Sequence, residues 1–196
     1  MTSERSDKLL KVLSQRQANI TVVLENVNDP RNITAVMRTC EAVGIQDIYI
    51  INTKAPVLKK FGYKSGSSSS KWLTIHQFES VAECFSELHT KFELILTTHL
   101  SSTSIDLYSI DFTKSIALVF GNEHSGVSDD ANNLADGNFI IPQMGIIQSL
   151  NISVACAVSI YEAYRQKNNA GHYQQSNMPE PQMQELRKQW GFDKEK

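Results

Sequence analysis

The feature that most constrains the fold of this chain is an alternation of short apolar runs with longer amphipathic segments. Five runs rich in aliphatic side chains predict strands, at residues 21–25, 48–51, 93–98, 115–120 and 138–141. Three segments with apolar residues at helical spacing separate them, at residues 30–44, 79–89 and 150–166. Strands that alternate with helices predict an α/β fold with a parallel sheet, which binds ligands at the carboxyl ends of its strands.

The two ends of the chain extend beyond this alternating pattern. Residues 5–17 predict an amphipathic helix with Leu9, Leu10 and Leu13 on one side, and a last helix is expected at residues 183–190 after two prolines. At about 150 residues per domain, 196 residues make one domain plus short additions. We therefore expect an N-terminal helical extension at 1–19, a central domain at 20–167 and a C-terminal extension at 168–196.

Positive charge is concentrated in the first part of the chain. Residues 1–78 carry 11 lysines and arginines against six acidic residues, whereas residues 79–161 carry two against ten. A stretch without any acid contains five lysines: Lys54, Lys59, Lys60, Lys64 and Lys71. Such a stretch is either a solvated loop or a surface that follows phosphates, and composition alone leaves both open.

The remaining composition argues against several classes of protein. Three cysteines, an odd number with no short spacing, indicate neither disulfides nor a zinc site, and they fit a reducing compartment. The first residues lack the apolar core of a leader peptide, and no run is long enough to span a membrane. We expect a soluble cytoplasmic protein without a metal. The glycine-rich signatures of dinucleotide-binding and P-loop proteins are also missing.

Three segments place polar residues directly after, or at the start of, a predicted buried element. They are N-D-P-R-N-I-T-A-V-M-R-T with Asn32 and Arg38, F-G-N-E-H-S-G-V with Glu123, and I-P-Q-M-G-I-I-Q-S-L-N-I-S-V-A with Ser149 and Asn151. Taken singly, each has a purely structural interpretation. Asn32 and Ser149 are suited to bond a helix start, and Glu123 or Arg38 to form surface charges.

Together, these segments resemble the three signature motifs of the SPOUT superfamily of RNA methyltransferases, in the branch that methylates ribose 2′-hydroxyl groups. The motifs are N-x-x-x-x-x-R (Asn32, Arg38), G-x-E-x-x-G (Gly121, Glu123, Gly126) and I-P-M-x-G followed by S-L-N-V/I-S (Ile141, Pro142, Gly145, Ser149, Leu150, Asn151, Ser153). Gln143 stands where methionine is frequent in the third motif. Over residues 8–173, the chain is most similar to the tRNA guanosine-18 2′-O-methyltransferases, the TrmH family.

This resemblance implies a parallel sheet whose C-terminal part forms a trefoil knot, a homodimer, a tRNA substrate and S-adenosylmethionine as cofactor. It implies cofactor contacts, made largely by main-chain groups, at Thr98, Leu100, Gly121, Ile141 and Leu150. The catalytic set that it implies is Arg38, Asn32, Glu123, Ser149 and Asn151. RNA contacts are expected from Lys11, Arg16, Lys59, Lys60, Lys64, Arg165 and Lys167.

Other functions remain open from the sequence. One is the same methyl transfer to a different tRNA or rRNA nucleotide, and another is a non-catalytic RNA-binding protein that keeps the fold. A third is an unrelated α/β domain that binds a small molecule. The complete polar set of the three motifs favours a methyltransferase over the non-catalytic protein, and failure to bind S-adenosylmethionine would favour the unrelated domain.

Overall fold

A computed structural model describes residues 2–54, 69–147 and 149–192. Its centre is a sheet of seven strands in the order β3-β2-β1-β6-β4-β7-β5, and every neighbouring pair is parallel. The strands are β1 (Ile20–Glu25), β2 (Asp47–Ile51), β3 (Thr74–Phe78), β4 (Leu94–Thr98), β5 (Ile105–Asp106), β6 (Ile116–Phe120) and β7 (Gly137–Ile140). The predicted parallel α/β fold is confirmed.

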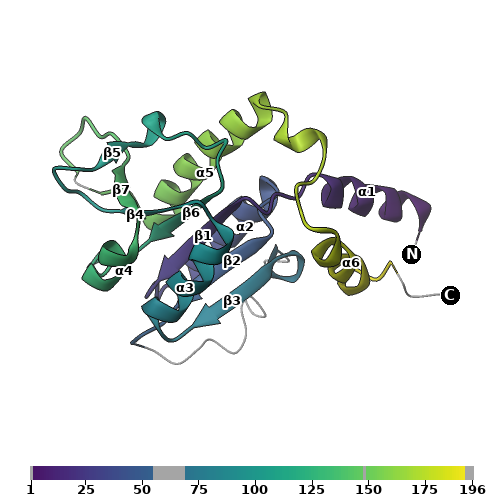
Figure 1. Cartoon of the computed structure of the whole chain (residues 1–196), viewed down its shortest axis with the longest axis horizontal. Helices are drawn as coiled ribbons and strands as arrows, with labels where there is room; N and C mark the ends of the chain where they lie inside the picture. Colours follow the sequence, from purple (N-terminus) through teal and green to yellow (C-terminus); the bar gives the residue numbers. More distant parts are fainter. Residues whose placement is uncertain (1, 55–68, 148, 193–196) are drawn as a thin grey trace.

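Helices cover both faces of this sheet (Figure 1). The helices are α1 (Ser3–Ser14), α2 (Pro30–Ala42), α3 (Val81–Lys91), α4 (Asp129–Leu134), α5 (Ile152–Asn169) and α6 (Glu180–Gln189). On one face, α2 and α5 pack together over a cluster that includes Val22, Met37 and Ile160. On the other face, α3 and α4 cover a cluster that includes Phe85 and Val119. Because β1 and β6 are buried throughout, the sheet centre is a two-sided core.

The two ends of the chain pack against each other (Figure 1). Leu9 and Leu13 of α1 form a separate apolar cluster with Leu186 of α6 and with Trp190. The indole of Trp190 meets that of Trp72 edge-on at 5.3 Å between ring centroids, at the end of a 3₁₀ turn (Ser69–Trp72). Two further 3₁₀ turns occur at Leu107–Ser109 and His172–Gln174. The extensions therefore form a small second cluster beside the sheet.

Local sequence signals explain where α2 begins and ends. Asp29 is the N-cap, its carboxylate accepts the Arg31 N–H, and Pro30 occupies the first helical position. Gly44 follows the helix at φ +83°, a conformation that favours glycine. A β-carbon there would also lie 2.8 Å from the carbonyl oxygen of Gln15. These signals fix the two ends of α2, the helix that follows β1.

Three elements were not predicted from the sequence. β3 alternates Thr, His and Gln with apolar residues and lies half-buried at a sheet edge, so its apolar signal is weak. β5 has only two residues, and α4 reads D-D-A-N-N-L with a single buried side chain, Ala131. The predicted strands and helices are all present, with their ends displaced by a few residues. No helix in the described part of the chain is long and apolar enough to cross a membrane.

Candidate active site

Three side chains from the three sequence motifs form one connected group. The Asn32 Nδ2 group donates a hydrogen bond to Glu123 Oε1 at 2.7 Å, and the Asn151 Nδ2 group donates to Asn32 Oδ1 at 3.3 Å. Asn32 therefore uses both ends of its amide, toward Glu123 on one side and Asn151 on the other. Residues that are 91 and 119 positions apart in the sequence are joined in this way.

The fold places each of these residues at the same edge of the sheet. Asn32 lies in the first turn of α2, which follows β1, and Glu123 lies in the loop that follows β6. Asn151 is the N-cap of α5, where its Oδ1 accepts the Ser153 N–H at 2.9 Å. Because β1 and β6 are neighbours in a parallel sheet, their carboxyl ends open onto one common site.

The loop that carries Glu123 is closed by two glycines. Gly121 lies so close to the returning chain that a β-carbon there would be 2.1 Å from the carbonyl carbon of Gly126. Gly126 has φ +68° and exchanges two main-chain hydrogen bonds with Asn122, of 3.1 and 2.9 Å. A β-carbon at position 121 would force this narrow loop open, and the positive φ at position 126 favours glycine, which together explain the glycine spacing of the second motif.

A layer of polar side chains that is not among the predicted site residues supports this loop. Glu25, at the end of β1, accepts the Ser128 N–H through Oε2 at 2.9 Å, and its Oε1 is buried with no hydrogen-bond partner in the described part of the chain. Asn26 and Asn122 continue this layer, because Asn122 Nδ2 donates to the Asn26 carbonyl at 2.9 Å. Asn122 lies inside the second motif, and Glu25 and Asn26 lie just before the first, and these positions were their only signal.

Arg38 and Ser149 do not join the connected group. Arg38 is exposed on α2, about two turns beyond Asn32, and makes no hydrogen bond or ion pair with any described residue. Ser149 is also exposed, just before the N-cap of α5, and has no such partner in the described ranges. Both side chains are therefore free to meet a substrate.

Four of the five predicted cofactor contacts, Thr98, Leu100, Gly121 and Ile141, lie at the carboxyl ends of β4, β6 and β7. These strands are direct neighbours, and Thr98 Oγ1 donates to the Val119 carbonyl at 3.1 Å. Leu100 follows β4 and is 78% exposed, and Ile141 follows β7 and is half-buried. Leu150 lies just before α5. No group of three or more acidic, histidine or cysteine side chains suited to a metal is found among the described residues.

Comparison with known proteins identifies the family to which the chain belongs. Residues 19–161, which contain all three motifs, match the SpoU rRNA Methylase family. The chain belongs to this family.

Three relatives of this SpoU methylase are informative. A tRNA (guanosine(18)-2'-O)-methyltransferase from Thermus thermophilus is 38% identical over 189 residues, which is 96% of each chain. The crystal structure of the A. aeolicus TrmH/SpoU tRNA modifying enzyme superposes with a TM-score of 0.87 at 34% identity and 98% coverage of both chains. An AdoMet-bound rRNA methyltransferase from Sinorhizobium meliloti gives a TM-score of 0.67 at 25% identity, over 80% of this chain and 59% of its own.

The basic residues expected to bind RNA have different environments in this SpoU methylase. Lys11 on α1 and Arg165 on α5 are exposed, and the Arg165 guanidinium bonds the Glu162 carboxylate at 2.7 Å. Lys59, Lys60 and Lys64 lie outside the described residues. The two ends of the lysine-rich stretch, Lys54 and Lys71, are exposed.

Arg16 and Lys167 require a correction, because both side chains are fully buried. Arg16 donates to the Ile45 carbonyl at 3.1 Å and lies 3.5 Å from Glu41, and burial lowers its pKa. The Lys167 ammonium bonds the Lys114 carbonyl at 3.0 Å, and burial lowers its pKa to about 8. Buried groups do not reach RNA without rearrangement, so we leave both out of the proposed RNA surface.

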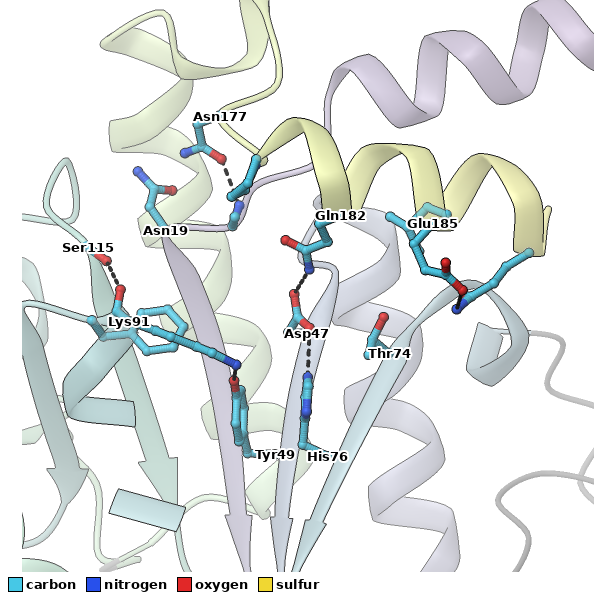
Figure 2. Close-up of a pocket in the computed structure, with 15 residues that line it drawn as sticks. Asn19, Asp47, Tyr49, Thr74, His76, Lys91, Ser115, Asn177, Gln182 and Glu185 are labelled. Atoms are coloured by element: carbon cyan, nitrogen blue, oxygen red, sulfur yellow. Dashed lines mark hydrogen bonds and ion pairs between the residues drawn. The ribbon is translucent and has the colours of Figure 1, made fainter. Parts of the chain in front are cut away.

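A cavity of about 680 Å³ lies elsewhere in this SpoU methylase, between α6 and the sheet. Figure 2 shows Asp47, Tyr49 and His76 of β2 and β3 beneath α6. Asp47 accepts hydrogen bonds from Gln182 Nε2 at 2.8 Å and pairs with His76 Nε2 at 2.7 Å. Because Asp47 begins β2, this cavity opens at the amino edge of the sheet, opposite the connected group. The cavity is therefore separate from the candidate active site. The hydrogen bond between Gln182 and Asp47 at its edge attaches α6 to the sheet.

Proposed function

We propose that this SpoU methylase transfers a methyl group from S-adenosylmethionine to the ribose 2′-hydroxyl of guanosine 18 in the D-loop of tRNA. The T. thermophilus relative that is named for this activity spans nearly the whole chain, including both extensions. The observation that carries the proposal is the convergence of Asn32, Glu123 and Asn151, one residue from each motif, at the edge where parallel sheets bind ligands.

The residues after β4, β6 and β7 fit S-adenosylmethionine. The close approach of Gly126 to Gly121 makes a wall of main chain without side chains, and Leu100 and Ile141 add apolar surface beside it. A purine presents hydrogen-bonding edges that main-chain N–H and C=O groups match. When bound there, the cofactor supplies an electrophilic methyl group on a sulfonium sulfur. We propose that the main chain at Thr98, Leu100, Gly121, Ile141 and Leu150 holds it.

Arg38 is the residue best placed to act on the substrate, because its guanidinium is exposed and uncommitted within the described chain. A guanidinium stays protonated in proteins and is a poor base, but it binds a phosphate with two parallel hydrogen bonds. We propose that Arg38 holds a substrate phosphate, and that this phosphate accepts the 2′-hydroxyl proton as the ribose oxygen takes up the methyl group. Asn32, Glu123, Ser149 and Asn151 orient the ribose and the loops. Positioning of this kind contributes roughly 7–11 kcal/mol to catalysis.

The assembly follows from the same proposal. We propose that the segment between β7 and α5 threads into a trefoil knot and that the protein acts as a cytoplasmic homodimer. Exposed apolar side chains support a partner surface, since Met144, Ile146 and Ile147 are 97%, 102% and 64% exposed. The terminal extensions at 1–19 and 168–196, which pack together through α1 and α6, would contact tRNA beyond the target nucleotide.

The proposed function is tested by methyl transfer from labelled S-adenosylmethionine to unmodified tRNA transcripts, followed by nucleoside mass spectrometry. The expected product is 2′-O-methylguanosine in the D-loop, and a transcript with guanosine 18 replaced by adenosine is the control. Transfer to rRNA fragments instead would keep the chemistry and change the substrate. Absence of both cofactor binding and transfer would contradict the proposal.

A further inference from the structure

The side chain of Asn122 makes three hydrogen bonds that shape the loop around Glu123 and attach it to the rest of the domain. Its Oδ1 accepts the His124 N–H at 2.9 Å and the Ser125 N–H at 3.3 Å, which lie on the far side of Glu123 in the loop. Its Nδ2 donates to the Asn26 carbonyl at 2.9 Å. One amide thus shapes the turn around Glu123 and ties that turn to the end of β1.

Asn26, which receives this bond, is itself unusual. It is 9% exposed and has φ +52°, and it is the only residue other than glycine with a positive φ among the described positions. Such a backbone conformation is unfavourable for most residues and persists where the surroundings hold it. Asparagine tolerates it better than most, because its short amide bonds nearby main chain.

The Asn26 side chain holds a third loop. Its Oδ1 accepts the Thr53 N–H at 2.9 Å, and its Nδ2 donates to Thr53 Oγ1 at 3.1 Å. Its own N–H bonds the Ile51 carbonyl at 2.8 Å. Asn26 therefore joins the chain that leaves β2 to the chain that leaves β1, while Asn122 continues the connection to the loop after β6.

These bonds form a continuous series from Thr53 through Asn26 and Asn122 to the loop of Glu123. From there, the Glu123 carboxylate reaches Asn32 and then Asn151. Because each link uses a short amide with few rotatable bonds, removal of one amide frees the next group along the series. The left-handed backbone at Asn26 turns the Asn26 carbonyl toward Asn122, so a change at either residue affects the same connection.

We infer that Asn26 and Asn122 are positioning residues for methyl transfer, acting on the substrate through Glu123 without touching it. The expected fall in kcat rests on the proposed function, whereas the expected loosening of the Glu123 loop rests on the hydrogen bonds alone. The two are measured separately.

The structural arm is amide hydrogen exchange at His124 and Ser125, which requires no substrate. Asn122→Ala removes the acceptor for both N–H groups, and we expect their exchange to accelerate at least tenfold. Asn26→Gly keeps the left-handed backbone but removes the clamp on Thr53, and a smaller acceleration at the same two amides is expected. Unchanged exchange in both variants would overturn the inference, whatever the enzyme acts on.

The kinetic arm compares kcat, KM for tRNA and Kd for S-adenosylmethionine. For Asn122→Ala and Asn26→Gly we expect kcat to fall at least tenfold, with KM and Kd within about twofold of the wild type. Asn26→Asp keeps an acceptor for the Thr53 N–H and tolerates the backbone, so it should recover most of the kcat lost in Asn26→Gly. Loss of cofactor binding in step with kcat would assign the two residues a merely structural role.

A matched control is Asp111→Ala, in the segment that leads into the amino end of β6. Asp111 Oδ1 also accepts a main-chain N–H, that of Thr113, at 3.0 Å. This variant loses an equivalent bond far from Glu123 and should leave kcat and the exchange of His124 and Ser125 unchanged. If the wild type transfers no methyl group to tRNA, the proposed function fails, and the exchange measurements still decide the inference.

Discussion

The amide of Asn32 and the carboxylate of Glu123 form a 2.7 Å hydrogen bond that joins the first turn of α2 to the loop after β6. A bond to an ionised acceptor is stronger than one between neutral groups. Arg38 lies on the same helix as Asn32, so this bond also fixes where the Arg38 backbone stands relative to Glu123. One hydrogen bond therefore places both Asn32 and Arg38 relative to Glu123, because the two residues lie on the same helix.

Replacing Arg38 with alanine should abolish turnover and leave cofactor affinity unchanged. The side chain makes no hydrogen bond or ion pair with the described part of the protein, so its removal breaks no internal contact. We expect kcat to fall at least 10²-fold, as for loss of proton-transfer assistance, with Kd for S-adenosylmethionine unchanged by calorimetry. Arg31→Ala, which removes an exposed arginine from the same helix, is the control. Weakened cofactor binding in Arg38→Ala would move Arg38 to a structural role.

Replacing Gly121 with alanine should disrupt the cofactor site and cost stability. The new β-carbon would lie 2.1 Å from the carbonyl carbon of Gly126 and 2.2 Å from the Val127 nitrogen, so main chain has to move. Overpacking of this kind costs about 1–3 kcal/mol. We expect a lower Tm and at least tenfold weaker S-adenosylmethionine binding. Gly137→Ala, at the amino end of β7, is the matched control, since the nearest atom to a β-carbon there is Leu96 Cδ2 at 3.4 Å, and equal behaviour of the two variants would refute the argument.

The fold was largely predictable because its core strands are continuous apolar runs. β1 and β6 are buried in full, and burial on both faces leaves nearly continuous apolar runs, in which Thr21 and the terminal Glu25 of β1 are the polar residues. The edge strand β3 was missed for the opposite reason, since half-burial permits Thr74, His76 and Gln77. An edge strand gains its stability from pairing with β2, which is a contact between distant segments.

The site was predictable at the motifs and less so beneath them. Asn32, Glu123 and Asn151 were identified through the family resemblance, and the structure joins them. Asn26 was not predicted, because its importance depends on a backbone dihedral and on a bond to Thr53 that no local pattern encodes. The expectation that Arg16 lies at the surface was wrong. A charged residue at the end of an amphipathic helix predicts exposure, but the packing of α1 against α6 and Trp190 encloses the Arg16 side chain.

Binding of tRNA should weaken steeply as salt is raised. Each phosphate neutralised adds a slope of about −0.7 to −0.9 to log K against log salt concentration. Lys11→Ala and Lys71→Ala each remove one exposed cation near the packed extensions and should each make the slope shallower by about one such unit. Lys114→Ala, an exposed lysine at the amino edge of β6, should leave the slope unchanged. A flat salt response of the wild type would argue against these lysines as the RNA surface.

The buried Lys167 should make stability rise with pH in the alkaline range. Its pKa is lowered to about 8 by burial, against 10.5 for a solvated lysine, although Asp111 and Glu93 partly oppose the shift. Between these two values the unfolded chain binds more protons than the folded one, so the free energy of unfolding increases as pH rises from about 8 toward 10. Below pH 8 both states are protonated and the cost of burying the charge is present in full.

Lys167→Met isolates this effect, because methionine fills similar space without a charge. We expect the stability of the wild type relative to this variant, measured by urea unfolding, to increase from pH 7.5 to pH 9.5. Burial raises the pKa of Tyr49 to about 12, whereas an unfolded tyrosine ionises near pH 10, so both proteins lose the same amount of stability as the pH nears 10. This shared loss cancels when the two free energies of unfolding are subtracted. Lys11→Met removes an exposed lysine and should follow the wild type at every pH. Parallel profiles for wild type and Lys167→Met would show that the ammonium keeps an ordinary pKa inside the fold.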